Sequence, residues 1–384
     1  MQSVSGTLAQ TLERYPRALE TIDRLITGES YFDIFKQLSD NYSPTLTVTR
    51  VQGPLVEALV KDGAGDQQHI MVSRSLYRSG SIAIRVGHSR PALWLSAHAD
   101  ICGYLTGEWD GTGYPLTPFC MHRASPGRRA AVALATPDGP GPLARLAEGE
   151  MVTRESGDVR FECACHDLPL CTRVVHHQPA EWDRASDRMV GFIDNQAGSA
   201  AMLLAAQALS HFDANALFLL NDEEEGPVDK GGQGFSRAAT RLLHRTPLDE
   251  LPSYVVVTDG HEQETALAHG ARTLFGHGAT FTGMSSRARG AVTPPQILAF
   301  TRVFADELRV CGIRLVEHGG YVGRSDDISA LQFTPNVSLI GYPAAYGHFD
   351  KTPFSYVGDL VHLTKALVLL ALVAQGSDWQ ARYL

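Results

Sequence analysis

The second half of the chain alternates short apolar strands with apolar helices, and this alternation limits the possible folds more than any other feature. Such a pattern favours a doubly wound α/β sheet with helices on both faces. Aliphatic runs at residues 216–220, 254–258 and 336–340 predict buried strands. Helical spacing at residues 198–209, 235–244, 297–310 and 358–373 predicts the intervening helices, so we expect a mixed sheet covered on both sides.

The first hundred residues predict the remainder of this α/β unit. Residues 7–38 carry helical periodicity, with a break near Pro16 because proline cannot continue a helix. β-rich runs follow at residues 45–51, 55–60, 69–72, 81–86 and 92–97. The last run is continuously apolar, which is typical of a strand buried on both faces.

Residues 101–189 differ from both flanks. They are rich in glycine and proline, alternate over short stretches and contain no long helical pattern. This composition predicts a small inserted β-barrel-like domain. We therefore divide the chain into one α/β domain made of residues 1–100 and 190–384, and an inserted β domain of residues 101–189.

Charge and composition exclude several classes of partner. The net charge of −9 argues against nucleic acid, whose binding proteins carry a basic face. The longest apolar stretch, near residues 360–373, is too short and too polar to span a membrane. No secretory signal is evident at the N-terminus. The six scattered cysteines do not form a disulfide pattern, so we expect a cytoplasmic protein with no membrane partner.

Five segments place metal-binding side chains at or just after the ends of strands. In doubly wound sheets the carboxyl ends of the strands form the ligand crevice. Histidines and carboxylates together suit a pair of divalent ions. Each segment alone is weak evidence, since strand-end histidines and acidic runs are usually structural or solvated, but their order strengthens the case. They are His98-Ala99-Asp100, Ile193-Asp194-Asn195, Asn221-Asp222-Glu223-Glu224-Glu225-Gly226, Thr258-Asp259-Gly260 and Tyr346-Gly347-His348.

The order of these segments resembles that of the co-catalytic dinuclear metallopeptidases. The pattern His-x-Asp, Asp-Asn, Glu-Glu-x-Gly, Asp, His is most similar to the glutamyl and deblocking aminopeptidases, a group that includes TET particles and cellulase-like proteins. Gly319-Gly320 followed by Asp327 adds to the likeness. The interval from His98 to Asp194, 194 − 98 = 96 residues, holds an inserted domain as in this group.

The resemblance implies a metallo-aminopeptidase that hydrolyses peptides with a water between two divalent ions. Zinc is the expected metal, with cobalt or manganese as alternatives. His98 and Asp259 would bind one ion, Glu224 and His348 the other, and Asp194 would bridge them. Glu223 would be the general base, and Asp100 would orient His98. The resemblance also implies a homo-oligomer, from a dimer to a TET-like dodecamer, with the inserted domain as its interface.

Three departures from the family leave alternatives open. The acidic run contains one extra glutamate, so Glu224 could be the base and Glu225 the ligand. Gly226 favours the first register, because it then lies two residues after the ligand. Residues 323–327 form a longer turn than in the family, and Ala344-Ala345-Tyr346 replaces the segment with an arginine before the last histidine.

Other functions remain compatible with the same residues. A dimetal deacylase acting on N-acyl amino acids would use the same chemistry, and a non-catalytic relative could serve binding or assembly. Cys163, Cys165 and Cys171, with His166, could form a structural zinc site. The usual Cys-x-x-Cys ligand pairs are missing, however, so a strand with alternate cysteines packed inward is the simpler explanation.

Overall fold

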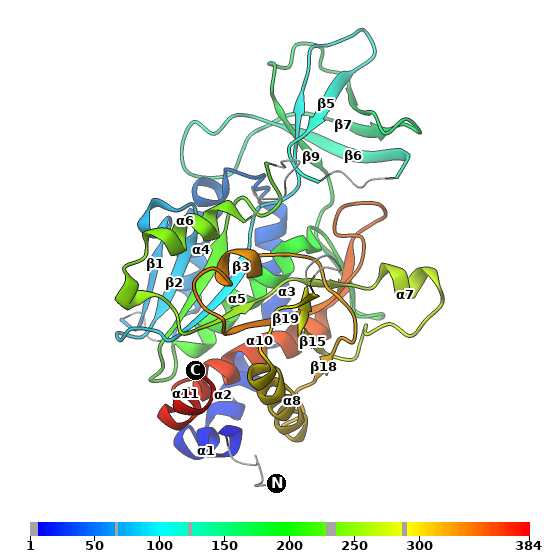
Figure 1. The fold of residues 1–384 in the computed structure, drawn as a ribbon. Helices are drawn as coiled ribbons and strands as arrows, with labels where there is room; N and C mark the ends of the chain where they lie inside the picture. Colours follow the sequence, from blue (N-terminus) through cyan, green and yellow to red (C-terminus); the bar gives the residue numbers. More distant parts are fainter. Residues whose placement is uncertain (1–6, 66–67, 122–124, 228–235, 286–289) are drawn as a thin grey trace.

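The computed structural model describes residues 7–65, 68–121, 125–227, 236–285 and 290–384. Its centre is a mixed sheet flanked by helices, which confirms the predicted fold class (Figure 1). The four central strands β12, β3, β13 and β19 are parallel to one another, while β2 and β15 run antiparallel to their inner neighbours. The strand order is β1 (Ile70–Ser73), β2 (Ile82–Val86), β12 (Ala216–Asn221), β3 (Leu93–His98), β13 (Tyr254–Val257), β19 (Val337–Ala344), β15 (Ala279–Thr282) and β18 (Leu315–Glu317), and β14 (Gly260–Glu262) pairs with β19.

Alternate residues of the central strands enter two separate cores. In β12, for example, Phe218 and Leu220 face one core, whereas Leu217 and Leu219 face the other. This follows from the two-residue period of a strand. The larger core packs against α3 (Gly28–Asp40), α5 (Gly198–Leu209), α8 (Pro295–Val310) and α10 (Val357–Val373). The smaller core packs against α6 (Arg237–Arg245) and α9 (Asp327–Ala330).

The N-terminal region contains both a confirmed and a wrong prediction. A break separates α1 (Thr7–Arg14) from α2 (Ala18–Leu25), as expected around Pro16. The runs predicted as strands at residues 45–51 and 55–60 lie instead largely in the helix α4 (Val48–Gly63). Its valines suggested a strand, but they are spaced so that Val48, Val51, Val56 and Val60 are all buried on one side of the helix. Packing against α5 and β1 overrides the strand preference of valine here.

A closed six-stranded barrel lies at the opposite end of the molecule from both termini (Figure 1). Apolar side chains such as Tyr104, Phe161 and Val174 fill it. Its strands, in spatial order, are β4 (Tyr104–Thr106), β5 (Tyr114–Pro118), β8 (Val159–Cys163), β7 (Arg145–Thr153), β6 (Gly127–Leu134) and β9 (Arg173–His176). The barrel predicted within the insertion is therefore confirmed.

The remaining elements connect these parts. β10 (Glu181–Asp183) and β11 (Arg188–Val190) form a small sheet with β20 (Phe354–Tyr356), outside the barrel. Short elements are η1 (Leu76–Arg78), η2 (Ile193–Ala197), η3 (Leu248–Glu250), α7 (Glu264–Ala268), β16 (Met284–Ser285), β17 (Gly290–Ala291) and α11 (Ser377–Tyr383). Among the described residues no single helix could cross a membrane, although α10 and α11 together, bent by 96°, have the necessary length and composition.

Candidate metal centre

The carboxyl ends of β3, β12 and β13 bring the predicted residues together. His98 is the last residue of β3 and lies opposite Asn221, the last residue of the parallel strand β12. The acidic run follows Asn221, and Asp259 follows β13 on the other side of β3. Asp194 comes from η2, and His348 comes from the loop after β19. Parallel strands end at a common edge, so ligands far apart in the sequence can meet there.

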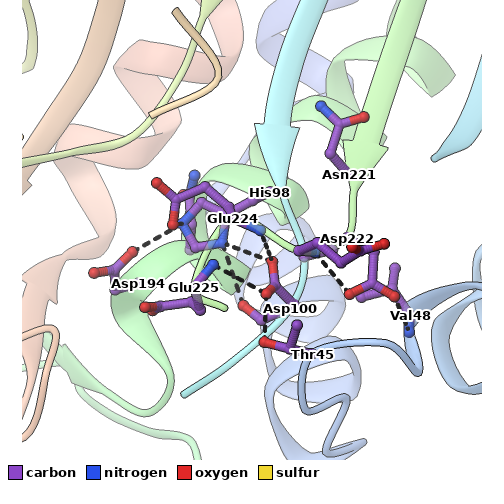
Figure 2. A network of polar contacts seen from close by, with 12 residues as sticks. Thr45, Val48, His98, Asp100, Asp194, Asn221, Asp222, Glu224 and Glu225 are labelled. Atoms are coloured by element: carbon purple, nitrogen blue, oxygen red, sulfur yellow. Dashed lines mark hydrogen bonds and ion pairs between the residues drawn. The ribbon is translucent and has the colours of Figure 1, made fainter. Parts of the chain in front are cut away.

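His98 lies at the centre of the cluster, fully buried among carboxylates (Figure 2). Its Nε2 is 3.0 Å from Asp194 Oδ1, 3.7 Å from Glu224 Oε2 and 3.7 Å from Asp259 Oδ2. On the other side of the ring, its Nδ1 lies 3.2 Å from the carbonyl oxygen of Asp100 and 3.5 Å from the Asp100 carboxylate. One imidazole nitrogen therefore faces three acidic side chains from three different segments.

Asp100 fixes the position of the acidic run. Its two carboxylate oxygens accept hydrogen bonds from the backbone N–H groups of Glu224 and Glu225, both at 3.1 Å. The hydroxyl of Thr45 donates to the same carboxylate at 2.7 Å (Figure 2). Asp100 is fully buried, and these donors satisfy its carboxylate oxygens. It thus orients both His98 and the two glutamates that follow β12.

The other half of the cluster is centred on His348. Its Nε2 lies 3.7 Å from Asp194 Oδ2, and its Nδ1 lies 3.9 Å from Glu225 Oε2. A Cβ at Gly347 would come within 2.7 Å of Asp194 Oδ2, so only glycine lets this backbone approach the carboxylate. Asp194 therefore faces both histidines, His98 through one oxygen and His348 through the other.

Glu223 points away from this cluster. Its carboxylate forms a salt bridge with Arg241 of α6, through both oxygens. Its neighbour Asp222 accepts hydrogen bonds from the backbone N–H groups of Leu46, Val48 and Glu223 itself. The first two residues of the acidic run are thus bound to structural partners, whereas Glu224 and Glu225 face the histidines.

Gly226 has a structural role that the sequence did not reveal. A Cβ at this position would lie 1.8 Å from the carbonyl oxygen of Phe119, in the loop that follows β5. The glycine is therefore required by the contact between the acidic run and the barrel. Its spacing from a glutamate cannot by itself decide which glutamate is the ligand.

Burial and mutual repulsion change the pKa values of the cluster. Burial, together with the nearby charge of Asp194, raises the pKa of Asp259 to about 7. Burial also raises the pKa of Glu224 and of Glu225 well above the usual range of a glutamate. For His98, burial alone lowers the pKa, but Glu224 and Asp259 together raise it well above its ordinary value. A bound cation would stabilise these buried carboxylates, because it would offset both their burial and their mutual repulsion.

The donor set fits divalent metal ions. Three groups of potential ligands each place their ligating atoms within 4.8 Å of one another: His98 with Glu224 and Asp259, His98 with Asp194 and Glu225, and His348 with Glu225 and Cys102. Nitrogen and carboxylate oxygen donors of this kind suit zinc and its neighbours in the transition series. All five predicted metal ligands therefore lie in or beside the cluster.

Two further residues of the site were not identified from the sequence. Cys102, two residues after Asp100, places its sulfur 3.4 Å from His348 Nδ1. Arg241 lies on α6 and binds Glu223. The position of Cys102 just after the end of β3 was the one sequence feature that could have indicated it. A single cysteine is weak evidence, however, until the structure shows which side chain it contacts. No sequence signal linked Arg241 to the acidic run.

The possible zinc site in the insertion has no support in the described part of the chain. The Cys163 thiol lies 3.2 Å from the carbonyl oxygen of Cys165, and the Cys165 thiol lies 3.0 Å from Asp167. Cys171 is exposed. Among the described residues, none of these cysteines belongs to a group with metal-binding spacing.

Known proteins share the fold rather than the sequence. No protein-family model and no curated protein matches the chain. A TET aminopeptidase from a marine sediment archaeon of the Thaumarchaeota superposes with a TM-score of 0.70 at 13% identity, covering 91% of this chain and 99% of that one. TET1 peptidase of Pyrococcus horikoshii gives 0.66 at 16% identity, with 89% and 99% covered. An endoglucanase of Thermotoga maritima gives 0.60 at 13% identity, with 89% and 98% covered. The chain thus has the fold of the TET aminopeptidases, as its motifs predicted.

Proposed function

We propose that this protein is a metal-dependent aminopeptidase that removes the N-terminal residue of peptides. The observation that carries the proposal is the position of His98 Nε2, which lies 3.0–3.7 Å from the carboxylates of Asp194, Glu224 and Asp259. Such a convergence of one imidazole and three acids at a sheet edge is costly without a cation. The fold shared with TET aminopeptidases supports the same conclusion.

We assign the ligands from the contacts of the two histidines. His98 and Asp259 would hold one ion, and Glu225 and His348 would hold the other. Asp194 would serve both, because its two oxygens face the two histidines and it lies in one group with Glu225. This is the alternative register of the acidic run. The first register, with Glu223 as base and Glu224 as ligand, is disfavoured because Arg241 holds the Glu223 carboxylate.

Glu224 is the proposed general base. Two divalent ions at such a site supply Lewis acidity, which lowers the pKa of a water molecule and polarises an amide carbonyl. The Glu224 side chain faces His98, and its backbone N–H donates a hydrogen bond to the Asp100 carboxylate. In this position Glu224 can take a proton from the attacking water and deliver it to the leaving amine. Asp100 keeps this base and His98 in a fixed relative position.

Two other chemistries differ from this one in their substrate or in the residues they need. A dimetal deacylase would use the same residues but would accept an acylated amine, whereas an aminopeptidase must bind a free one. Glycoside hydrolysis, suggested by the name of the Thermotoga maritima endoglucanase, needs a pair of carboxyl groups and no histidine nitrogens among them. The two histidines of the cluster therefore favour amide hydrolysis by metal ions.

A metal count combined with a substrate screen tests the proposal. After loading with zinc or cobalt, elemental analysis should find two ions per chain, and the protein should hydrolyse amino-acid anilides but not their N-acetylated forms. Activity on the acetylated forms alone would support the deacylase. An absence of bound metal after loading would overturn the metallopeptidase assignment, and two bound ions with no hydrolysis of either series would support a binding protein.

Assembly and location form the remaining part of the proposal. TET1 peptidase of Pyrococcus horikoshii can assemble into a tetrahedron or a large octahedral shell. We propose that this chain also self-associates, through the inserted domain of residues 101–189, and that it works in the cytoplasm on peptides. The six cysteines, all unpaired, are compatible with a reducing compartment.

A further inference from the structure

The two histidines of the site are arranged alike. Each turns its Nε2 towards Asp194, at 3.0 Å for His98 and 3.7 Å for His348. Each turns its Nδ1 towards the short segment that follows β3. For His98 the partner there is Asp100, and for His348 it is Cys102, whose sulfur lies 3.4 Å from Nδ1.

Cys102 is held in place by the barrel. Its side chain is 6% exposed and belongs to the apolar cluster that contains Tyr104, Tyr114 and Cys120. A thiol in such surroundings cannot rotate freely into solvent, so its position relative to His348 is fixed by packing. Sulfur is a weak hydrogen-bond acceptor, but in a buried site it can still select one form of a neighbouring imidazole.

We propose that Cys102 is the positioning residue of His348, and this rests on the metal centre proposed above. The sulfur accepts a hydrogen bond from Nδ1–H of His348. The proton therefore stays on Nδ1, and the lone pair of Nε2, which faces Asp194, remains available to a metal ion. Histidine ligands are commonly held in this way by a second hydrogen bond, usually to a carboxylate or a carbonyl. Cys102 thus does for His348 what Asp100 does for His98.

A different role for the same sulfur makes a different prediction. The ligating atoms of Cys102, Glu225 and His348 lie within 4.8 Å of one another, so the sulfur could itself bind an ion. A thiolate ligand gives cobalt(II) an intense charge-transfer absorption in the near ultraviolet, whereas a sulfur that contacts only the imidazole gives none. Cobalt spectra therefore separate the positioning role from direct ligation.

The experiment measures the two zinc affinities of the full-length protein by competition with a chelator. Cys102→Val, which removes the acceptor and keeps the site apolar with a slightly larger side chain, should weaken one of the two sites by about 10–100-fold and leave the other unchanged. Cys102→Ser restores most of that affinity, because a hydroxyl also accepts from Nδ1–H. Met151→Leu is the control in the same apolar cluster, and it should leave both affinities unchanged. The cobalt-loaded wild type should show no thiolate charge-transfer band.

Three results would overturn the inference. The first is equal zinc affinities in Cys102→Val and the wild type. The second is a cobalt charge-transfer band that Cys102→Val abolishes, which would make the sulfur a ligand. The third is an Nε2–H form of His348 in the metal-free wild type, read from its imidazole ¹⁵N shifts. This last measurement is made on the wild type, so it does not depend on whether a variant folds. A wild type that binds no metal at all refutes the proposed function, whereas two normal sites in Cys102→Val refute only the role of Cys102.

Discussion

Four successive acidic residues at the end of β12 have four different partners. Asp222 accepts the backbone N–H groups of Leu46 and of Val48, at the start of α4, and Glu223 binds Arg241. Glu224 faces His98, and Glu225 faces His348. Since carboxylates this deeply buried are stable only with such partners, the partner of each residue indicates its role. Two residues of the run thus have structural partners, and two belong to the proposed metal centre.

Glu224→Gln should abolish most turnover without removing metal. An amide cannot accept the proton of the attacking water, and a general base typically contributes about 10²–10⁴-fold to the rate. We expect both ions to remain, as measured by elemental analysis alongside kcat on an amino-acid anilide. Glu223→Gln is the matched control, because it changes the neighbouring glutamate that binds Arg241, and it should keep both ions and most activity. The opposite result, with Glu223→Gln inactive and fully metallated, would restore the first register.

Asp194→Asn should reduce metal content more than any other single change in the cluster. Its two carboxylate oxygens face the two histidines, so an amide in their place weakens the ligand set of both ions. Asp259→Asn and Glu225→Gln should each weaken only one ion. Metal content after dialysis against a weak chelator ranks the variants, and an Asp194→Asn protein that retains both ions would contradict its bridging role.

At the scale of single elements, the start of α10 shows how a helix end can depend on pH. Asp359 lies in the first turn of α10, and its carboxylate oxygens accept the backbone N–H groups of Gly278 at 2.7 Å and Gly276 at 2.8 Å. The side chain is fully buried. Burial raises its pKa from the ordinary 3.8 to about 7, although the two N–H groups act in the opposite direction.

This pKa predicts a loss of stability as the pH rises. The unfolded carboxyl ionises near pH 3.8, whereas the folded one keeps its proton to about pH 7, so the folded state binds more protons between these values. The free energy of unfolding should therefore fall through this window, by at most about 4 kcal/mol from this group. Urea unfolding of the wild type and Asp359→Asn at several pH values measures the difference. If the gap between the two proteins does not change with pH, Asp359 does not titrate in this range.

At the scale of the whole molecule, the metal centre joins parts that are distant in the chain. Its proposed ligands run from residue 98 to residue 348 and come from β3, η2 and the segments after β12, β13 and β19. The barrel also contacts the centre, through Phe119 against Gly226 and through Cys102. Ions bound there would hold the sheet edge and the barrel together.

Metal removal should therefore lower the thermal stability of the entire α/β unit. An ion that binds only the folded state stabilises that state by about 2.7 kcal/mol when the free ion concentration is 100 times the dissociation constant. We expect Tm to rise with free zinc and to fall on chelation in the wild type, with a much smaller response in Asp194→Asn. Differential scanning calorimetry provides the measurement, and equal zinc responses in both proteins would exclude the cluster as the binding site.

Self-association provides a further test at this scale. If the inserted domain of residues 101–189 forms the interface, sedimentation at micromolar concentration should show an oligomer. A chain with polar substitutions on the exposed apolar residues of the barrel, such as Leu146 and Leu170, should shift towards the monomer. A monomeric wild type would contradict the proposed assembly and leave the metal centre untouched.

Local patterns in the sequence predicted the α/β sheet, the barrel and the segments that meet at the candidate metal centre, because apolar periodicity and strand-end chemistry are local. The strands predicted at residues 45–51 and 55–60 were wrong, because buried valines with helical spacing resemble a strand until α5 and β1 are present to cover them. Only the tertiary structure separated Glu223 from Glu224, since Arg241 and Asp100 reach the acidic run from other elements. It likewise placed Cys102 against His348, across 246 residues of chain. Contacts between residues so far apart in the chain depend on how the helices and strands pack together, and local sequence patterns do not predict that packing.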